Sequence, residues 1–295
     1  MTQTIRIGIG SIVVGLVVLA LKTLAWWVTG SVALLSDALE STVNVAAAVA
    51  ALIAIRIAAK PADHGHPYGH HKAEFFSAVL EGVLIIVAAL VILRKSYYGI
   101  LAPTPLEAPA LGLAINVAAG VLNSIWCWVL ISRGRHHQSP ALVADGKHLL
   151  ADVITSAGVV LGVLLAVATG YAILDPILAA LVALNILWSG WKLMTSSLSG
   201  LMDEAVSQDL MRVIRETIAD RAEGAIEAHD LRTRQAGSAT FIDFHLVVDG
   251  ATSVSEAHQI CDRIETALKA KLTEAQITIH VEPDNKAKHA GILVL

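Results

Sequence analysis

The sequence predicts a membrane-spanning, all-α bundle of six helices, followed by a small α+β domain. Of its 295 residues, 55% are hydrophobic and 16% are charged, and the mean hydropathy is +0.66. This composition is too apolar for an ordinary soluble domain. Residues 1–202 hold 9 acidic and 11 basic residues, whereas residues 203–295 hold 16 and 10. We therefore expect a membrane domain over 1–202 and a water-exposed domain over 203–295.

Six apolar segments are each long enough to cross about 30 Å of hydrocarbon, which takes about 20 helical residues. They cover residues 5–28, 32–59, 75–97, 106–132, 142–169 and 176–197. The first segment has no cleavage signature, so we interpret it as a membrane helix rather than a signal peptide.

The loops after the second and fourth segments are flanked by six basic residues: Arg56, Lys60, Lys72, Arg133, Arg135 and Lys147. The opposite loops, around Gly30 and Gly170, carry none. By the positive-inside rule, both chain termini are expected in the cytoplasm of a multi-pass membrane protein. Arg94 and Lys95 disagree, and snorkelling toward the opposite headgroups would accommodate them.

The C-terminal region alternates between helical and strand patterns. We expect helices over residues 207–221 and 253–272, and strands over 228–234, 239–248 and 276–281. This order is typical of an α+β domain with its helices on one face of a sheet. Cys127 and Cys261 have no pairing pattern, so no disulfide is expected. The sequence pI of about 6.3 and the lack of a basic stripe argue against binding to nucleic acid.

Two pairs of polar residues lie inside the predicted membrane helices. Glu40 and Asn44 are four residues apart in the second helix, and His148 and Asp152 are four apart in the fifth. Each pair shares a helix face, and ionisable groups in a span should point to the bundle interior. Together they offer one nitrogen and three oxygens to a divalent metal ion. The alternative is a hydrogen-bonded clamp between helices without an ion.

Asp37 lies one turn before Glu40. It either extends this site or serves as a structural or access residue.

The loop between the second and third segments is dense in histidine and carboxylate. Asp63, His66 and His70 have the best spacing for a peripheral metal site, with His64 and His71 as alternatives. A solvated turn, in which Gly and Pro only set the geometry, is the other interpretation.

Histidines recur on the predicted strands and second helix of the C-terminal domain. They are His229, His245, His258 and His280, and Glu282 follows two residues later. Positions 280 and 282 point to the same face of a strand, so this cluster is a candidate for one or two metals. Scattered surface histidines are the alternative.

Four separated motifs occur in order along the chain: AWWVTGSVALLSDA at 25–38, PADHGHPYGH at 61–70, ADGKHLLAD at 144–152 and HDLRTR at 229–234. Together they resemble the cation diffusion facilitator family of metal transporters. The resemblance covers essentially the whole chain and implies a homodimeric metal/proton antiporter in a lipid bilayer. It also implies a ferredoxin-like cytoplasmic domain that responds to metal.

The resemblance also implies a role for each candidate residue. The transport site would be Glu40, Asn44, His148 and Asp152, and the loop site Asp63, His66 and His70. In the C-terminal tail (residues 203–295), the binuclear site would be His229, His245, His258, His280 and Glu282. Lys72 and Asp203 would form a charge interlock at the dimer contact.

One departure from the family pattern affects the choice of metal. Zinc-transporting relatives usually have aspartate at the position of Asn44, and the amide removes one negative charge. Zinc, iron, cobalt, nickel, cadmium and manganese therefore all stay open as substrate and regulatory ligand. Relatives usually have aspartate at the position of Glu282, and the glutamate side chain places its carboxylate one methylene farther from the backbone.

The rival function is a metal sensor or assembly protein that uses the same ligands without moving ions. An enzyme is disfavoured, because no nucleophile–base motif or phosphate-binding loop occurs in the sequence.

Overall fold

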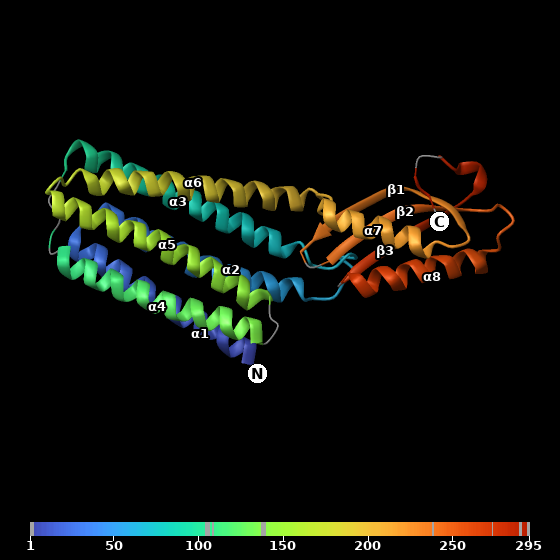
Figure 1. Ribbon diagram of the computed structural model, residues 1–295, viewed down its shortest axis with the longest axis horizontal. Coiled ribbons are helices and arrows are strands. Elements are labelled where there is room, and N and C mark those ends of the chain that lie inside the picture. The colour runs from blue at the N-terminus through green and yellow to red at the C-terminus, as the bar shows by residue number, and fades with distance from the viewer. Residues whose placement is uncertain are drawn as a thin grey trace. The chain divides into compact units, whose positions relative to one another are not determined.

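The structure is a computed structural model that describes residues 3–103, 107, 109–136, 140–237, 239–272, 274–288 and 291–293. The side chains of residues 3–6, 8, 51, 55, 134–136, 140–145, 147, 148, 151 and 293 lie outside this description. Six long helices come first in the chain (Figure 1). They are α1 (Gln3–Thr29), α2 (Val32–Ala58), α3 (Ala73–Leu101), α4 (Pro109–His136), α5 (Pro140–Thr169) and α6 (Leu174–Leu201).

The helix ends follow local rules of the backbone. Pro109 and Pro140 open α4 and α5, where proline lacks only an N–H that would have no partner inside the helix. Gly30 and Gly170 follow α1 and α5 with φ of 65° and 74°, the left-handed conformation that favours glycine after a helix. At the start of α2, the Val32 N–H donates to Asp175 Oδ2 at 2.7 Å.

The chain divides into two compact units. One comprises residues 1–53 and 77–195, which hold most of the six helices. The other comprises residues 54–76 and 196–295, so the loop between α2 and α3 folds with the C-terminal region. The boundary after residue 202 stays a prediction.

The helical unit places apolar side chains on its outside and small ones at its helix contacts. All six helices are long and apolar enough to cross a membrane. Trp128 and Trp188 are 71% and 69% exposed, whereas Ala25, Ala89 and Ala179 are fully buried. At Gly190 of α6, an added Cβ would lie 2.6 Å from Ile85 of α3, so only glycine allows this approach. Small residues at contacts and large apolar residues facing outward are typical of helices packed in lipid.

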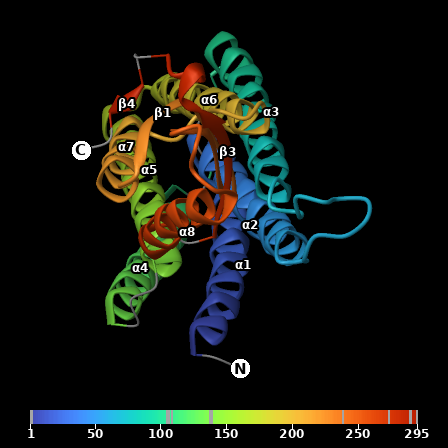
Figure 2. The same cartoon turned by 90° about the vertical axis from the view of Figure 1, so that its right-hand side faces the viewer.

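The C-terminal region forms a four-stranded sheet with two helices. Its elements are α7 (Gln208–Arg221), β1 (Ala225–Ala236), β2 (Ala239–Val248), α8 (Val254–Lys271), β3 (Ala275–Pro283), η1 (Asp284–Lys286) and β4 (Ile292–Leu293). The strand order is β3-β2-β1-β4, with β2 and β3 parallel and the other pairs antiparallel. Figure 2 shows α7 and α8 beside the strands, with β4 next to β1.

One apolar core holds this sheet to its helices. Ile214 and Ile218 of α7 and Ile264 of α8 pack with Ile242 and Phe244 of β2, and all five are buried. Ser253 and Glu256 form a reciprocal capping box at the start of α8, which satisfies two backbone donors. The predicted fold class is confirmed, although the two-residue strand β4 was not predicted because such a short strand has no sequence period.

Candidate metal centres

The polar residues of α2 and α5 meet inside the helical unit. Asn44 Nδ2 donates to Asp152 Oδ2 at 2.6 Å, and Thr155 Oγ1 donates to Glu40 Oε2 at 3.4 Å. The Asp152 residue is 5% exposed. His148 lies in α5 one turn before Asp152, and its side chain is outside the described part of the chain. The structure thus brings together three of the four residues predicted for the site within the membrane.

A second buried contact lies one turn away. Lys22 of α1 donates to Asp37 Oδ1 at 2.6 Å and to Ser156 Oγ at 2.9 Å. Ser156 in turn donates to Asp37 Oδ1 at 2.6 Å. Sequence reasoning missed Lys22 and Ser156. A single lysine within the apolar run of α1 was the available signal, because a charge in a membrane span needs a partner.

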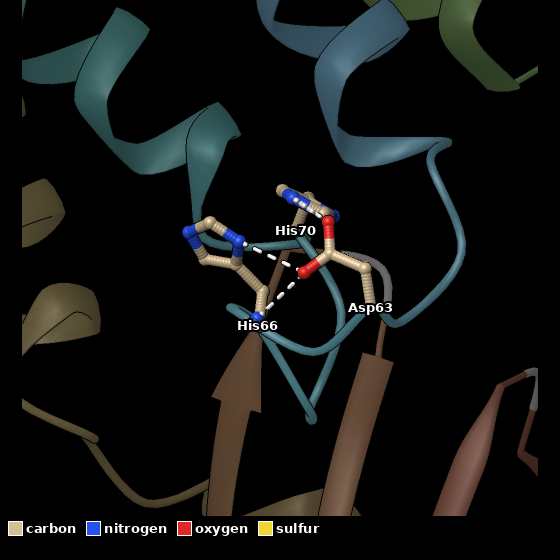
Figure 3. Close-up of side chains that lie close together, drawn as sticks. All are labelled: Asp63, His66 and His70. Atoms are coloured by element: carbon tan, nitrogen blue, oxygen red, sulfur yellow. Dashed lines mark hydrogen bonds and ion pairs between the residues drawn. The ribbon is translucent and has the colours of Figure 1, made fainter.

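The loop between α2 and α3 gathers the three predicted ligands (Figure 3). Asp63 Oδ1 lies 3.3 Å from His66 Nδ1, and Asp63 Oδ2 lies 3.5 Å from His70 Nε2. One ligand atom of each residue lies within 4.8 Å of the others. Figure 3 shows both imidazole rings beside the Asp63 carboxylate. This spacing is compatible with one metal ion held between nitrogen and oxygen ligands.

Hydrogen bonds from the backbone favour the ionised form of the Asp63 carboxylate. The N–H groups of His66 and Gly65 donate to Asp63 Oδ1 at 2.7 and 2.9 Å. The hydrogen bond from the His66 backbone lowers the pKa of Asp63 most, because it stabilises the ionised form. His70 Nδ1 is buried and has no hydrogen-bond partner.

Aromatic and charged side chains join this loop to the tail sheet, and all of them belong to the same compact unit. Arg234 of β1 lies 4.0 Å from the Phe241 ring centre and 5.4 Å from that of Tyr68. Lys72 and Arg234 both pair with Asp203, at 2.9 and 3.2 Å. The hydrogen bond from Lys72, followed by that from Arg234, holds the pKa of Asp203 below its usual value.

The same contacts border a cavity of about 370 Å³, lined in part by His66 and His70. The family resemblance implies a Lys72–Asp203 interlock at a dimer contact; the pair forms within one chain, and its place at a dimer contact stays a prediction. Sequence reasoning missed the contributions of Tyr68 and Arg234.

Three histidines form a row across the tail sheet. His229 of β1 is opposite His245 of β2, which is opposite His280 of β3. Neighbouring ring centres are 5.3 and 4.9 Å apart. Glu282 reaches back to this row and lies 3.2 Å from His229 Nε2, 3.3 Å from His245 Nδ1 and 3.7 Å from His280 Nε2.

The side chains of the tail group are compatible with a bound metal. His229 Nε2 and His245 Nδ1 are buried and make no hydrogen bond. Both nitrogens instead lie 3.2 and 3.3 Å from the Glu282 carboxylate, and imidazole nitrogens beside a carboxylate form a ligand set that divalent metals commonly use.

A β-bulge adds Asp230 to this group. The pairing of β1 with β2 shifts register between His229 and Arg232, and Asp230 has a φ of 51°. Consecutive strand residues normally point to opposite faces, but a bulge can turn both the same way. Asp230 Oδ2 consequently lies 3.8 Å from His245 Nδ1. Sequence reasoning missed Asp230, because strict alternation places it away from His229.

Two further residues, Glu227 and Lys288, contact members of this group. Glu227, a buried carboxylate, lies 3.0 Å from His229 Nδ1 and can fix that ring, as carboxylates often do for metal-binding histidines. Lys288 Nζ lies 2.6 Å from Asp230 Oδ2, and its hydrogen bond is the largest cause that lowers the pKa of Asp230.

His258 does not join the row in the described chain. It lies on α8 with 74% of its side chain exposed, 3.7 Å from Asp262 on the same helix. Its predicted ligand role stays a prediction.

Comparisons with known proteins agree with this architecture. A family model described as the cation efflux transmembrane domain matches residues 9–202. Another, described as the cytoplasmic domain of cation efflux proteins, matches residues 206–284.

Individual relatives match over most of the chain. An uncharacterized transporter of Synechocystis is 45% identical over 92% of this chain and 88% of its own length. The cation-efflux pump FieF of Pectobacterium atrosepticum is 34% identical over 92% of this chain and 89% of its own. The solved structure of CzrB in its Zn form is 46% identical, covering 29% of this chain and 98% of that chain, with a TM-score of 0.28.

Proposed function

The chain belongs to the cation diffusion facilitator family of cation efflux transporters, and we propose that it exports a divalent transition-metal ion from the cytoplasm in exchange for protons. The observation that carries this proposal is the pairing of polar side chains between α2 and α5 within helices that can span a membrane. Polar groups at such a position are costly, and they commonly mark an ion pathway.

The proposed transport site consists of Glu40, Asn44, His148 and Asp152. Glu40 and Asp152 supply two negative charges, which match the charge of one dication. Asn44 can give its carbonyl oxygen to the metal once the amide turns away from Asp152. This oxygen-rich set with one nitrogen suits zinc, iron, cobalt, nickel, cadmium or manganese, without selecting among them.

Proton coupling would pass through His148. An imidazole must be neutral to bind a cation, so a metal that arrives from the cytoplasm displaces a proton. A proton from the other side then favours release. Opening of the bundle alternately to each side around this fixed site would complete the cycle.

We propose that the tail and the loop between α2 and α3 lie in the cytoplasm. Both belong to one compact unit, which supports a common side of the bilayer for them. The basic residues Arg56, Lys60 and Lys72 near this loop favour the cytoplasmic side. Both chain termini then lie in the cytoplasm as well.

The loop and tail groups are proposed as regulatory sites. The loop site is Asp63, His66 and His70, and the tail site contains His229, His245, His280 and Glu282. Metal at the tail would order this domain and bias the bundle toward one state. We also propose a homodimer, with His258 completing the tail site and the Lys72–Asp203 pair located at the contact between copies.

Flux measurements in proteoliposomes test this function. The native chain should move Zn²⁺ or Co²⁺ against its gradient when a pH gradient is imposed. Protons should move the opposite way, so the lumen becomes more alkaline when metal enters and more acidic when metal leaves. A panel of divalent ions, compared between native and Asn44→Asp, tests the metal. Because zinc-transporting relatives usually have aspartate at this position, we expect Asn44→Asp to shift the preference toward Zn²⁺.

The rival, a metal sensor or assembly protein of the same fold, is favoured only by the missing carboxylate at Asn44. A sensor would bind metal in the same vesicles without any ion flux or proton movement. Metal binding without flux would therefore reject the transport proposal.

A further inference from the structure

Lys22 is a charged side chain buried within a helix that can span the membrane. It is only 2% exposed, and it lies in the apolar run of α1. Its ammonium group contacts Asp37 Oδ1 at 2.6 Å and Ser156 Oγ at 2.9 Å. Because Ser156 also donates to Asp37, the three residues form a closed polar triangle that links α1, α2 and α5.

This triangle lies next to the proposed transport site. Asp37 precedes Glu40 by three residues on α2, and Ser156 follows Asp152 by four residues on α5. Residues with these spacings are neighbours on one helix face, about one turn apart. The stripe shared by α2 and α5 therefore contains three carboxylates, Asp37, Glu40 and Asp152, and Lys22 stands beside the first of them.

The charges in this stripe determine how much positive charge it attracts. Two carboxylates balance one dication, but three leave an excess negative charge in a medium of low dielectric constant. Asp37 Oδ2 is buried and makes no hydrogen bond, so this oxygen has capacity for a cation. The ammonium of Lys22 compensates the Asp37 charge through the other oxygen.

We propose that Lys22 is a specificity-determining counter-charge that keeps Asp37 out of the metal site. With Asp37 paired, the site presents the charge of two carboxylates and releases one dication readily. Without Lys22, Asp37 becomes a third anionic group that retains the metal. This inference rests on the proposed function, since it assigns Glu40 and Asp152 to the transported ion. The competing explanation is a brace that only holds three helices together.

Three substitutions in the full chain separate the two explanations: Lys22→Met, Asp37→Asn and the double variant. Methionine keeps an unbranched side chain of similar length without charge, and asparagine keeps the shape of aspartate. In proteoliposomes, Lys22→Met should lower both the KM for Co²⁺ and the maximal rate, each on the order of tenfold. Asp37→Asn leaves the lysine charge uncompensated and should raise the KM by a similar factor.

The double variant is the decisive measurement. If Lys22 acts through charge, the two single changes move KM in opposite directions and the double variant returns within about threefold of native. If Lys22 is only a brace, the double variant is at least as impaired as either single one, and the proposal is overturned. Should Lys22→Met fail to accumulate in membranes, rescue of Asp37→Asn by the second substitution gives the same decision.

Metal binding distinguishes failure of this inference from failure of the proposed function. Absence of flux by the native chain rejects transport. Even without flux, Co²⁺ binding can be measured in detergent. The part of that binding that is lost in Asp152→Asn is assigned to the membrane site. Opposite shifts of that affinity in the two single variants would support the counter-charge, and parallel shifts would reject it.

Discussion

The polar site within the helices and the histidine row of the tail use similar side chains, but they differ in how these side chains are satisfied without metal. Between α2 and α5, Asp152 accepts from Asn44 and Glu40 accepts from Thr155. In the tail, two buried imidazole nitrogens make no hydrogen bond. Both nitrogens lie 3.2 and 3.3 Å from the Glu282 carboxylate, so nitrogen and oxygen ligand atoms face one another there.

This difference suggests different tasks for the two sites. The proposed transport site must pass through an empty state in every cycle, and the Asn44 amide and the Thr155 hydroxyl can stabilise its carboxylates in that state. In the described part of the tail, the two imidazoles face the Glu282 carboxylate instead, and we propose that this group holds a metal rather than releasing it. The predictions that follow test this contrast, from the largest expected effect to the smallest.

Asp152→Asn should abolish flux at the membrane site. The change removes one of two proposed anionic ligands and should reduce the rate of Co²⁺ uptake into proteoliposomes about 100-fold or more. Asp220→Asn makes the same chemical change on the exposed surface of α7 and should leave the rate near native. Flux above one tenth of native in Asp152→Asn would remove this residue from the site.

His245→Ala combined with His280→Ala should weaken metal binding by the tail. Loss of two neighbouring nitrogens from the row should lower tail affinity for Zn²⁺ about 10–100-fold, as measured by calorimetry on the full chain. The rise in melting temperature that Zn²⁺ causes should also be smaller in this double variant. His258→Ala, measured alongside, tests whether that residue is a ligand, and a native affinity would remove it from the tail site.

Lys288→Met should strengthen the same site. Lys288 pairs with Asp230 at 2.6 Å, and an incoming dication must compete with this ammonium for the carboxylate. We expect a few-fold higher Zn²⁺ affinity at low salt, with a smaller difference at high salt, because the pair is partly exposed. Lys286→Met, an exposed lysine of η1, is the matched control. Equal effects of both variants would indicate only a change in net charge.

Asp203→Asn should have the smallest effect. Its partners are partly exposed, so the loss should be about 0.5 kcal/mol of stability at neutral pH and less in high salt. Lys72 and Arg234 lower the pKa of Asp203 from 3.8. The contribution is therefore present above 3.8 and is lost as pH falls through the lowered value. Melting curves of both chains should converge in that acidic range, and a gap that widens there would contradict the assignment.

Much of the architecture follows from the sequence, because the length of an apolar run and the cost of a buried charge are local properties. They predict the six helices and the meeting of Asn44 with Asp152. Lys22 could not be paired in advance, since its partners come from two other helices. Asp230 was missed because a bulge breaks the two-residue alternation, and bulges carry no reliable sequence pattern.

The folding of residues 54–76 with the tail affects how the tail can be studied. A chain cut after residue 203 would leave Tyr68 without its edge-on contact to Phe241, whose ring centre lies 5.9 Å away. It would also strip one wall from the cavity beside His66 and His70. A truncated protein would therefore carry a damaged loop as well as a missing domain, and its defects could not be attributed to either one.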